Sequence, residues 1–271
     1  MPHANEHPST GLPSPPLTEP GLVSFVGAGP GDPELLTLKG RKAIEEAGLV
    51  LYAGSLVPPA VVSCARAEAQ VVDSAPLTLE ECHRLVRGAS LAGQKVARVH
   101  TGDPSLYGAL REQAALLDAD GIPWRVIPGV TAACAAAAAA GITFTVPEVT
   151  QSLIITRMEG RTPMPESERL SQLAAHGTSL AVYLSAHVAE DLQAELRRSL
   201  PPETPVVCAC RVGWPEERII RTTLEELARA VDTAGITRQA IFLILPGEAQ
   251  KGAPSRLYAA DFSHGWRRGT E

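Results

Sequence analysis

The sequence has no long apolar run of the kind that crosses a membrane. Its longest apolar stretch, residues 131–141, is dominated by alanine and is shorter than the roughly 20 residues that a membrane-spanning helix requires. The N-terminus also lacks a charged start followed by an apolar segment, so it does not resemble a secretory signal. These absences predict a cytoplasmic protein that does not act at a membrane.

Cysteine patterns typical of metal sites are missing as well. The five cysteines are Cys64, Cys82, Cys134, Cys208 and Cys210. They form no CxxC pair and have no histidine at zinc-ligand spacing. We therefore expect buried thiols in a reducing compartment and no bound metal. A redox or metal role for Cys208 and Cys210, which would share one face of a strand, stays the alternative.

An excess of basic charge is also absent. Lysine and arginine number 24 against 30 aspartates and glutamates, so the formal net charge is −6. This balance argues against nonspecific nucleic-acid binding, which needs a basic surface. If the ligand is a polyanion, arginines must be concentrated at its binding site to overcome the repulsion from the overall negative charge of the protein.

The order of apolar segments predicts two α/β domains, each with a central, mostly parallel or mixed sheet flanked by helices. Residues 1–20 are rich in proline and lack apolar periodicity, which predicts a disordered leader. The pattern breaks again around Pro147. We therefore place an N-terminal domain at 21–147, a C-terminal domain at 148–262 and a tail at 263–271.

The individual elements follow from short apolar runs that end at Gly or Pro turns and from segments of helical spacing. The predicted strands are 22–26, 49–52, 96–100, 124–127, 152–156, 180–184, 205–210, 218–224 and 240–245. The predicted helices are 38–47, which Thr37 can cap, then 106–117, the alanine-rich 133–141, 167–176, 187–199 and 224–234.

Three loops at predicted strand ends form the densest chemical signal. They are GAGPGDP at 27–33, TGDPSLYG at 101–108 and PGVTA at 128–132. In open α/β sheets, ligands bind at the carboxyl ends of strands, and glycine lets the backbone approach them. Asp103 suits a ribose or an ammonium group, with capping of the next helix as the alternative. Together the loops predict a ligand cradle.

A dinucleotide site is the competing interpretation of the glycine loop. GAGPGD departs from GxGxxG because a proline interrupts it, and the end of the second strand offers no acidic residue for a ribose. An NAD-dependent oxidoreductase is therefore disfavoured.

In this order and spacing, VGAGPGDPELLTLKG, TGDPSLYG, PGVTA and YLSAH resemble the tetrapyrrole methyltransferase family, over nearly all of residues 21–268. The segments LYAGSLV, VPEVTQSLIITR, EGRTPMPE and FSHGWRRG are similar to the subgroup that methylates carbon 11 of precorrin-4 in cobalamin biosynthesis. The resemblance implies S-adenosylmethionine as cofactor, bound between two domains, and a homodimer. It leaves open whether the substrate is metal-free or contains cobalt, and other precorrin or uroporphyrinogen methyltransferases remain alternatives.

The resemblance also implies the site residues. The cofactor would contact Pro30, Thr101, Gly102, Asp103, Ser105, Leu106, Thr131, Ala132, Leu184, Val212 and Ala240. Leu184 departs from the methionine of many relatives, although either residue gives an apolar contact.

The polycarboxylate tetrapyrrole substrate calls for arginines, because a guanidinium binds a carboxylate bidentately. The candidates are Arg157 and Arg161 in the subgroup loop, with Arg111, Arg211 and Arg218. His100, Tyr107 and Glu112 are candidate bases for proton removal. An ordinary polar role stays the alternative for each base candidate, so the catalytic residues are left open.

Overall fold

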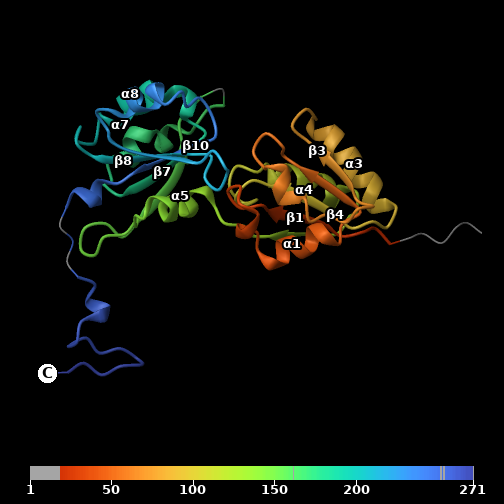
Figure 1. Ribbon diagram of the computed structural model, residues 1–271, viewed down its shortest axis with the longest axis horizontal. Helices are drawn as coiled ribbons and strands as arrows, with labels where there is room; N and C mark the ends of the chain where they lie inside the picture. The colour runs from red at the N-terminus through yellow and green to blue at the C-terminus, as the bar shows by residue number, and fades with distance from the viewer. Residues whose placement is uncertain (1–18, 161, 251, 253, 271) are drawn as a thin grey trace, which may run out of the picture.

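The computed structural model describes residues 19–160, 162–250, 252 and 254–270. It contains two five-stranded sheets that lie side by side (Figure 1). None of the helices in these ranges is long and apolar enough to cross a membrane.

The first sheet is entirely parallel, with the strand order β3-β2-β4-β1-β5. Its strands are β1 (Val23–Gly27), β2 (Leu49–Tyr52), β3 (Gln70–Asp73), β4 (Val96–His100) and β5 (Trp124–Ile127). Its helices are α1 (Leu38–Glu45), α2 (Pro59–Val62), α3 (Leu79–Leu91) and α4 (Leu110–Ala119). Thr37 caps α1 as predicted, because its hydroxyl accepts a hydrogen bond from the Gly40 amide at 3.0 Å.

Both faces of the first sheet are covered by helices. Alternate residues of β1 and β4 pack on α1 and α2 on one face and on α3 and α4 on the other. This two-sided burial explains why the strands read as continuous apolar runs.

The second sheet is mixed, with the order β6-β7-β10-β8-β9. Only β6 and β7 pair in parallel, and the other neighbours are antiparallel. Its strands are β6 (Leu153–Arg157), β7 (Ser179–Tyr183), β8 (Pro205–Cys210), β9 (Arg218–Thr223) and β10 (Ala240–Ile244). Helices α6 (Leu170–Ala174), α7 (Ala189–Leu196) and α8 (Leu227–Thr233) cover one face.

Helix α5 (Ala132–Ala140) covers the other face of the second sheet. Its alanines pack against Ala181, Val207 and Ile241, and such small side chains allow the helix to approach the sheet closely. This helix lies within the predicted N-terminal domain 21–147, yet its core is that of the second sheet. A boundary between β5 and α5 therefore accounts for the packing better than one at residue 147, and we propose it in place of the predicted one.

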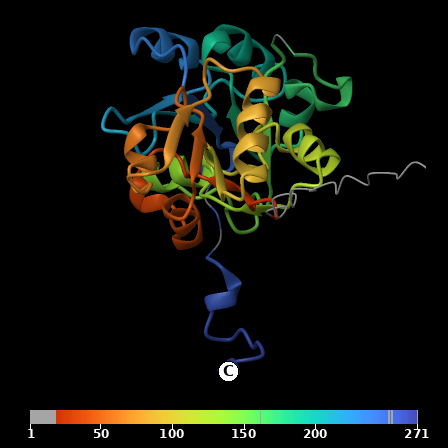
Figure 2. The ribbon, with the colours of Figure 1, turned by 90° about the vertical axis from the view of Figure 1, so that its right-hand side faces the viewer.

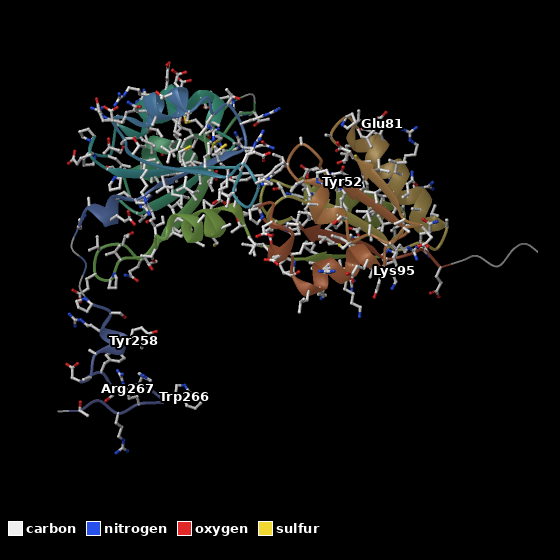
Figure 3. The ribbon with its side chains drawn as sticks, in the orientation of Figure 1. Tyr52, Glu81, Lys95, Tyr258, Trp266 and Arg267 are labelled. Atoms are coloured by element: carbon white, nitrogen blue, oxygen red, sulfur yellow. The ribbon has the colours of Figure 1, made fainter. Side chains whose placement is uncertain are left out.

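The C-terminal segment, residues 254–270, stands apart from both sheets in two perpendicular views (Figure 1, Figure 2). Within it, the Arg267 guanidinium donates hydrogen bonds to the carbonyls of Leu257, Ala259 and Phe262. The segment leaves Trp266 97% exposed and Tyr258 80% exposed (Figure 3). The predicted leader falls almost wholly outside the described residues.

Candidate functional site

The three glycine-containing loops lie backbone against backbone at the carboxyl ends of β1, β4 and β5. The Gly29 and Gly102 amides donate to each other's carbonyls at 3.2 and 2.7 Å. A Cβ added to Gly27 would lie 2.4 Å from the Gly129 nitrogen, and one added to Gly129 would lie 2.2 Å from the Gly102 carbonyl oxygen. Such contacts leave no space for a side chain, so glycine at 27 and 129 is a steric requirement of the cradle.

Asp103 holds the second loop to the third. One carboxylate oxygen accepts from the Gly129 amide at 2.9 Å, and the other accepts from the Ser105 amide at 2.9 Å and the Ser105 hydroxyl at 2.5 Å. Burial alone would raise the pKa of Asp103, but these hydrogen bonds from Ser105 and Gly129 bring its pKa below the usual value. The carboxylate is therefore ionised at neutral pH and gives the cradle a fixed negative charge.

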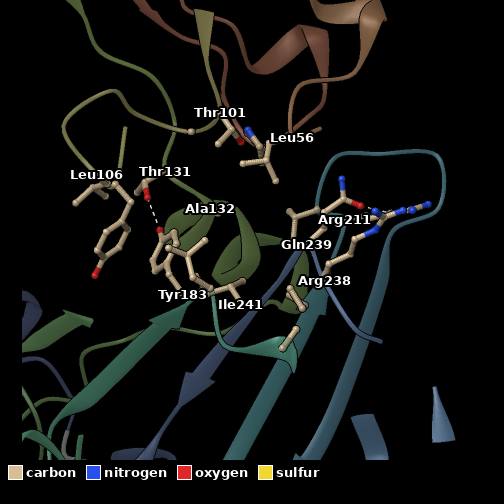
Figure 4. Close-up of a pocket in the computed structure, with 18 of the residues that line it drawn as sticks. Leu56, Thr101, Leu106, Thr131, Ala132, Tyr183, Arg211, Arg238, Gln239 and Ile241 are labelled. Atoms are coloured by element: carbon tan, nitrogen blue, oxygen red, sulfur yellow. Dashed lines mark hydrogen bonds between the residues drawn. The ribbon is translucent and has the colours of Figure 1, made fainter. Parts of the chain in front are cut away.

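A cavity of about 450 Å³ lies between this cradle and the second sheet (Figure 4). Ten of the predicted cofactor contacts line it: Pro30, Thr101, Gly102, Asp103, Leu106, Thr131, Ala132, Leu184, Val212 and Ala240. Ser105 is not part of the lining, and its two hydrogen bonds to Asp103 give it a supporting position instead.

Tyr183, at the end of β7, connects the second sheet to the third loop. Its hydroxyl accepts from the Ala133 amide at 2.9 Å and shares a 2.5 Å hydrogen bond with the Thr131 hydroxyl (Figure 4). Burial raises the pKa of the Tyr183 phenol, so it stays protonated. Tyr183 begins the YLSAH motif, but it was not among the predicted site residues, because its role depends on a contact between distant parts of the chain.

Two further contacts join the sheets across the cavity. The Trp214 indole donates to the Pro30 carbonyl at 3.2 Å, and the Gln239 side chain donates to the Ser55 carbonyl at 2.7 Å. Gln239 also accepts from the Arg211 guanidinium at 2.8 Å, and that guanidinium lies over the Trp214 ring. Neither Trp214 nor Gln239 was predicted.

Strained backbone is concentrated around the cavity. Tyr107, Leu184, Arg211 and Gln239 all line it and all have φ between 52° and 56°. For residues other than glycine, this left-handed conformation costs about 1–2 kcal/mol each. Such strain persists only where the surroundings enforce it and is typical of ligand sites. Leu184 also leaves 55% of its surface exposed, which offers an apolar surface to a ligand.

The predicted substrate arginines are spread over several places. Arg211 lines the cavity. Arg157 donates to the carbonyls of Met158, Thr162 and Pro163 in its own loop, and Arg218 donates to the Ala234 carbonyl. Arg111 is exposed on α4, away from the lining, and Arg161 lies outside the described residues. Arg238, which was not predicted, does line the cavity.

The three candidate bases also lie in different places, and only one of them lines the cavity. Tyr107 lines the cavity, and burial raises the pKa of its phenol. Glu112 is exposed in the first turn of α4 and does not reach the lining. His100 is buried and does not line this cavity. Desolvation together with the charge of Arg98 lowers the pKa of His100 to about 3. A group with that pKa is a weak base at neutral pH. In the part of the chain that the structure describes, no three His, Cys, Asp or Glu side chains gather as metal ligands would.

Comparison with known proteins agrees with this geometry. Residues 22–228 match the family model of the tetrapyrrole (corrin/porphyrin) methylases. A cobalt-precorrin-4 C(11)-methyltransferase of Priestia megaterium is 42% identical over 91% of this chain and 98% of its own length. A precorrin-4 C(11)-methyltransferase of Pseudomonas aeruginosa is 45% identical over 91% and 99%.

Solved structures of tetrapyrrole methyltransferases also resemble this chain. The X-ray structure of a cobalt-precorrin-4 methyltransferase superimposes with a TM-score of 0.80 at 42% identity, covering 83% of this chain and 94% of the other. A uroporphyrin-III C-methyltransferase of Thermus thermophilus, in complex with S-adenosylhomocysteine, superimposes with a TM-score of 0.68 at 28% identity, covering 83% and 97%. The chain belongs to the tetrapyrrole methyltransferase family.

Proposed function

We propose that this protein transfers a methyl group from S-adenosylmethionine to carbon 11 of precorrin-4, giving precorrin-5 in cobalamin biosynthesis. The observation that carries the proposal is the glycine-tight cradle facing the second sheet, in a chain 42% and 45% identical to enzymes with this named activity. Because those two relatives are named for the cobalt-containing and the metal-free substrate respectively, the proposal includes both forms.

The cavity has the size that this cofactor needs and, at the cradle, a negative charge that suits its cationic part. Its volume of about 450 Å³ lies within the range of small-molecule pockets. The ionised Asp103 favours a ligand that carries positive charge. Leu106, Leu184 and Val212 add apolar walls, so the cradle on one side and the ends of β7, β8 and β10 on the other would hold the two ends of one ligand.

When bound, S-adenosylmethionine supplies a methyl group on a sulfonium sulfur, which is already a strong electrophile. The chain therefore contributes proximity and orientation, which supply on the order of 7–11 kcal/mol of barrier lowering in favourable cases. Asp103, Tyr183 and the three glycine loops fix the cradle, and Arg211 and Arg238 place positive charge at the cavity for the substrate carboxylates. We assign no dedicated nucleophile.

The activity is tested by incubating the protein with precorrin-4 and cofactor labelled with ¹³C at the transferred methyl. The proposal predicts that ¹³C NMR locates the label on carbon 11 of the product ring. Label at another ring carbon would refute the regiochemistry and leave the family intact, whereas no transfer to either the metal-free or the cobalt form would refute the proposal.

We also propose that the enzyme is a cytoplasmic homodimer. The C-terminal segment 254–270 supports the dimer, because exposed aromatic side chains such as Trp266 are typical of contact surfaces (Figure 3). Light scattering on the full chain should give twice the monomer mass of 28.5 kDa, and a chain ending at residue 253 should shift toward the monomer. A full chain that stays monomeric at micromolar concentration would exclude the dimer.

A further inference from the structure

A second cavity, of about 280 Å³, adjoins the one described above. The two share Leu56, Thr101, Leu106 and Tyr107 in their linings. It lies on the face of the first sheet that α3 and α4 cover, at the end of β4. A ligand large enough to extend beyond the first cavity would therefore reach this one.

Arg98, in the middle of β4, brings a positive charge to the second cavity. Its guanidinium donates to the Gln113 side chain at 2.9 Å, the Ser74 hydroxyl at 2.9 Å and the Leu51 carbonyl at 3.3 Å. All three acceptors are neutral, and no carboxylate of the described chain lies within 4.0 Å of the guanidinium. Burial accordingly lowers the pKa of Arg98. A largely buried cation without an anion is costly, and an anionic ligand at this position would offset that cost.

His100 lies two residues further along β4 and therefore on the same face of the sheet. It lines the second cavity, is 5% exposed, and its Nε2 atom has no hydrogen-bond partner among the described residues. A buried polar atom of this kind is rare in native structures and indicates a ligand or a water molecule. Arg98 and His100 thus present an unbalanced charge and an unpaired nitrogen to one space.

We propose that the second cavity binds one carboxylate side chain of the tetrapyrrole substrate, with Arg98 as its counter-ion and His100 Nε2 as a hydrogen-bonding partner. This assignment rests on the proposed function. The apolar lining residues Ala53, Leu77 and Leu79 suit the methylene part of an acetate or propionate arm. Because the anchored arm lies beside the methyl-transfer cavity, it sets which ring carbon faces the methyl group.

The test uses uroporphyrin III, a fluorescent tetrapyrrole with eight carboxylates, as the probe. Its Kd is measured by fluorescence anisotropy for the full-length wild type, Arg98→Lys, Arg98→Gln and His100→Leu, together with the Kd of S-adenosylhomocysteine and the Tm. Loss of one charge-assisted carboxylate contact should weaken porphyrin binding about 10- to 100-fold in Arg98→Gln. Arg98→Lys, which keeps the charge, and His100→Leu should lose less, and S-adenosylhomocysteine binding should stay unchanged in all three.

Arg125→Gln is the matched control. Arg125 is an exposed arginine of the same sheet whose guanidinium donates to the Ser24 hydroxyl at 3.0 Å, and it lines neither cavity. Its porphyrin affinity should equal that of the wild type.

Three outcomes would count against these proposals: two would overturn the carboxylate site, and one would overturn the proposed function. Wild-type porphyrin affinity in Arg98→Lys, Arg98→Gln and His100→Leu would overturn the carboxylate site and leave the proposed function standing. Parallel loss of Tm and of both ligands would make Arg98 a purely structural residue and overturn the site as well. A wild type that binds neither S-adenosylhomocysteine nor porphyrin would instead overturn the proposed function.

Discussion

Removal of the Tyr183 hydroxyl tests how the two sheets are joined at the cradle. Tyr183→Phe keeps the ring and its packing but removes the acceptor of the Ala133 amide and the partner of the Thr131 hydroxyl. Ala133 is fully buried at the start of α5, where amides have no partner within the helix. An orphaned buried donor costs about 1–3 kcal/mol. Because the freed Thr131 hydroxyl, at the N-cap, can turn to the helix amides, we expect about 1–2 kcal/mol.

This loss should appear in urea unfolding as a lower free energy of unfolding with an unchanged m-value. Calorimetric titration should show S-adenosylhomocysteine binding weakened about tenfold, which corresponds to about 1.4 kcal/mol. Tyr52→Phe is the control, because Tyr52 ends β2 and its hydroxyl makes no hydrogen bond within the described residues. If Tyr183→Phe matched Tyr52→Phe in both stability and affinity, the hydroxyl would not join the sheets and the argument would be refuted.

Three other perturbations test separate parts of the site. Asp103→Ala frees the Gly129 amide and, at this partly exposed position, should lower the free energy of unfolding by about 1 kcal/mol and weaken S-adenosylhomocysteine binding. Unchanged values in urea unfolding and calorimetry would contradict this. Gly31→Ala would place a Cβ 2.3 Å from the Trp214 ring, so the indole must move away from the first loop. Tryptophan fluorescence should shift and affinity should fall, and an unshifted spectrum would count against the contact. His100 has a pKa of about 3 in the folded chain against 6.5 unfolded, so its contribution is fully present above pH 6.5 and is lost as pH falls toward 3. Between pH 6.5 and 5 the wild type should lose about 1.6 kcal/mol more than His100→Gln in urea unfolding, and parallel pH profiles would refute this.

Most strands were predictable because burial on both faces leaves a clear apolar run. The predicted ranges 49–52, 96–100, 124–127 and 205–210 coincide with β2, β4, β5 and β8. The strand β3 was not predicted, since Gln70–Asp73 is a short, mostly exposed edge strand whose two valines, Val71 and Val72, make too short an apolar run to stand out. Helix α3 was also missed, although the sequence TLEE at 78–81 is typical of the capping box that Thr78 and Glu81 form.

The cradle was predictable because its requirement is local: glycine where backbones touch, as at Gly27 and Gly129. The half of the site that belongs to the second sheet was less predictable. Trp214 and Gln239 reach the first sheet across the cleft, and no spacing in the sequence encodes that contact. Arg157 was selected by its loop, yet its guanidinium is occupied by carbonyls of that same loop.

The central claim is that one cleft, between the glycine loops and the second sheet, binds a sulfonium cofactor and not a dinucleotide. Parallel calorimetric titrations of the purified chain with S-adenosylhomocysteine and with NAD test it most directly. The account predicts one S-adenosylhomocysteine per chain, with binding reduced in Tyr183→Phe, and no heat of binding with NAD. Binding of NAD without binding of S-adenosylhomocysteine would contradict it.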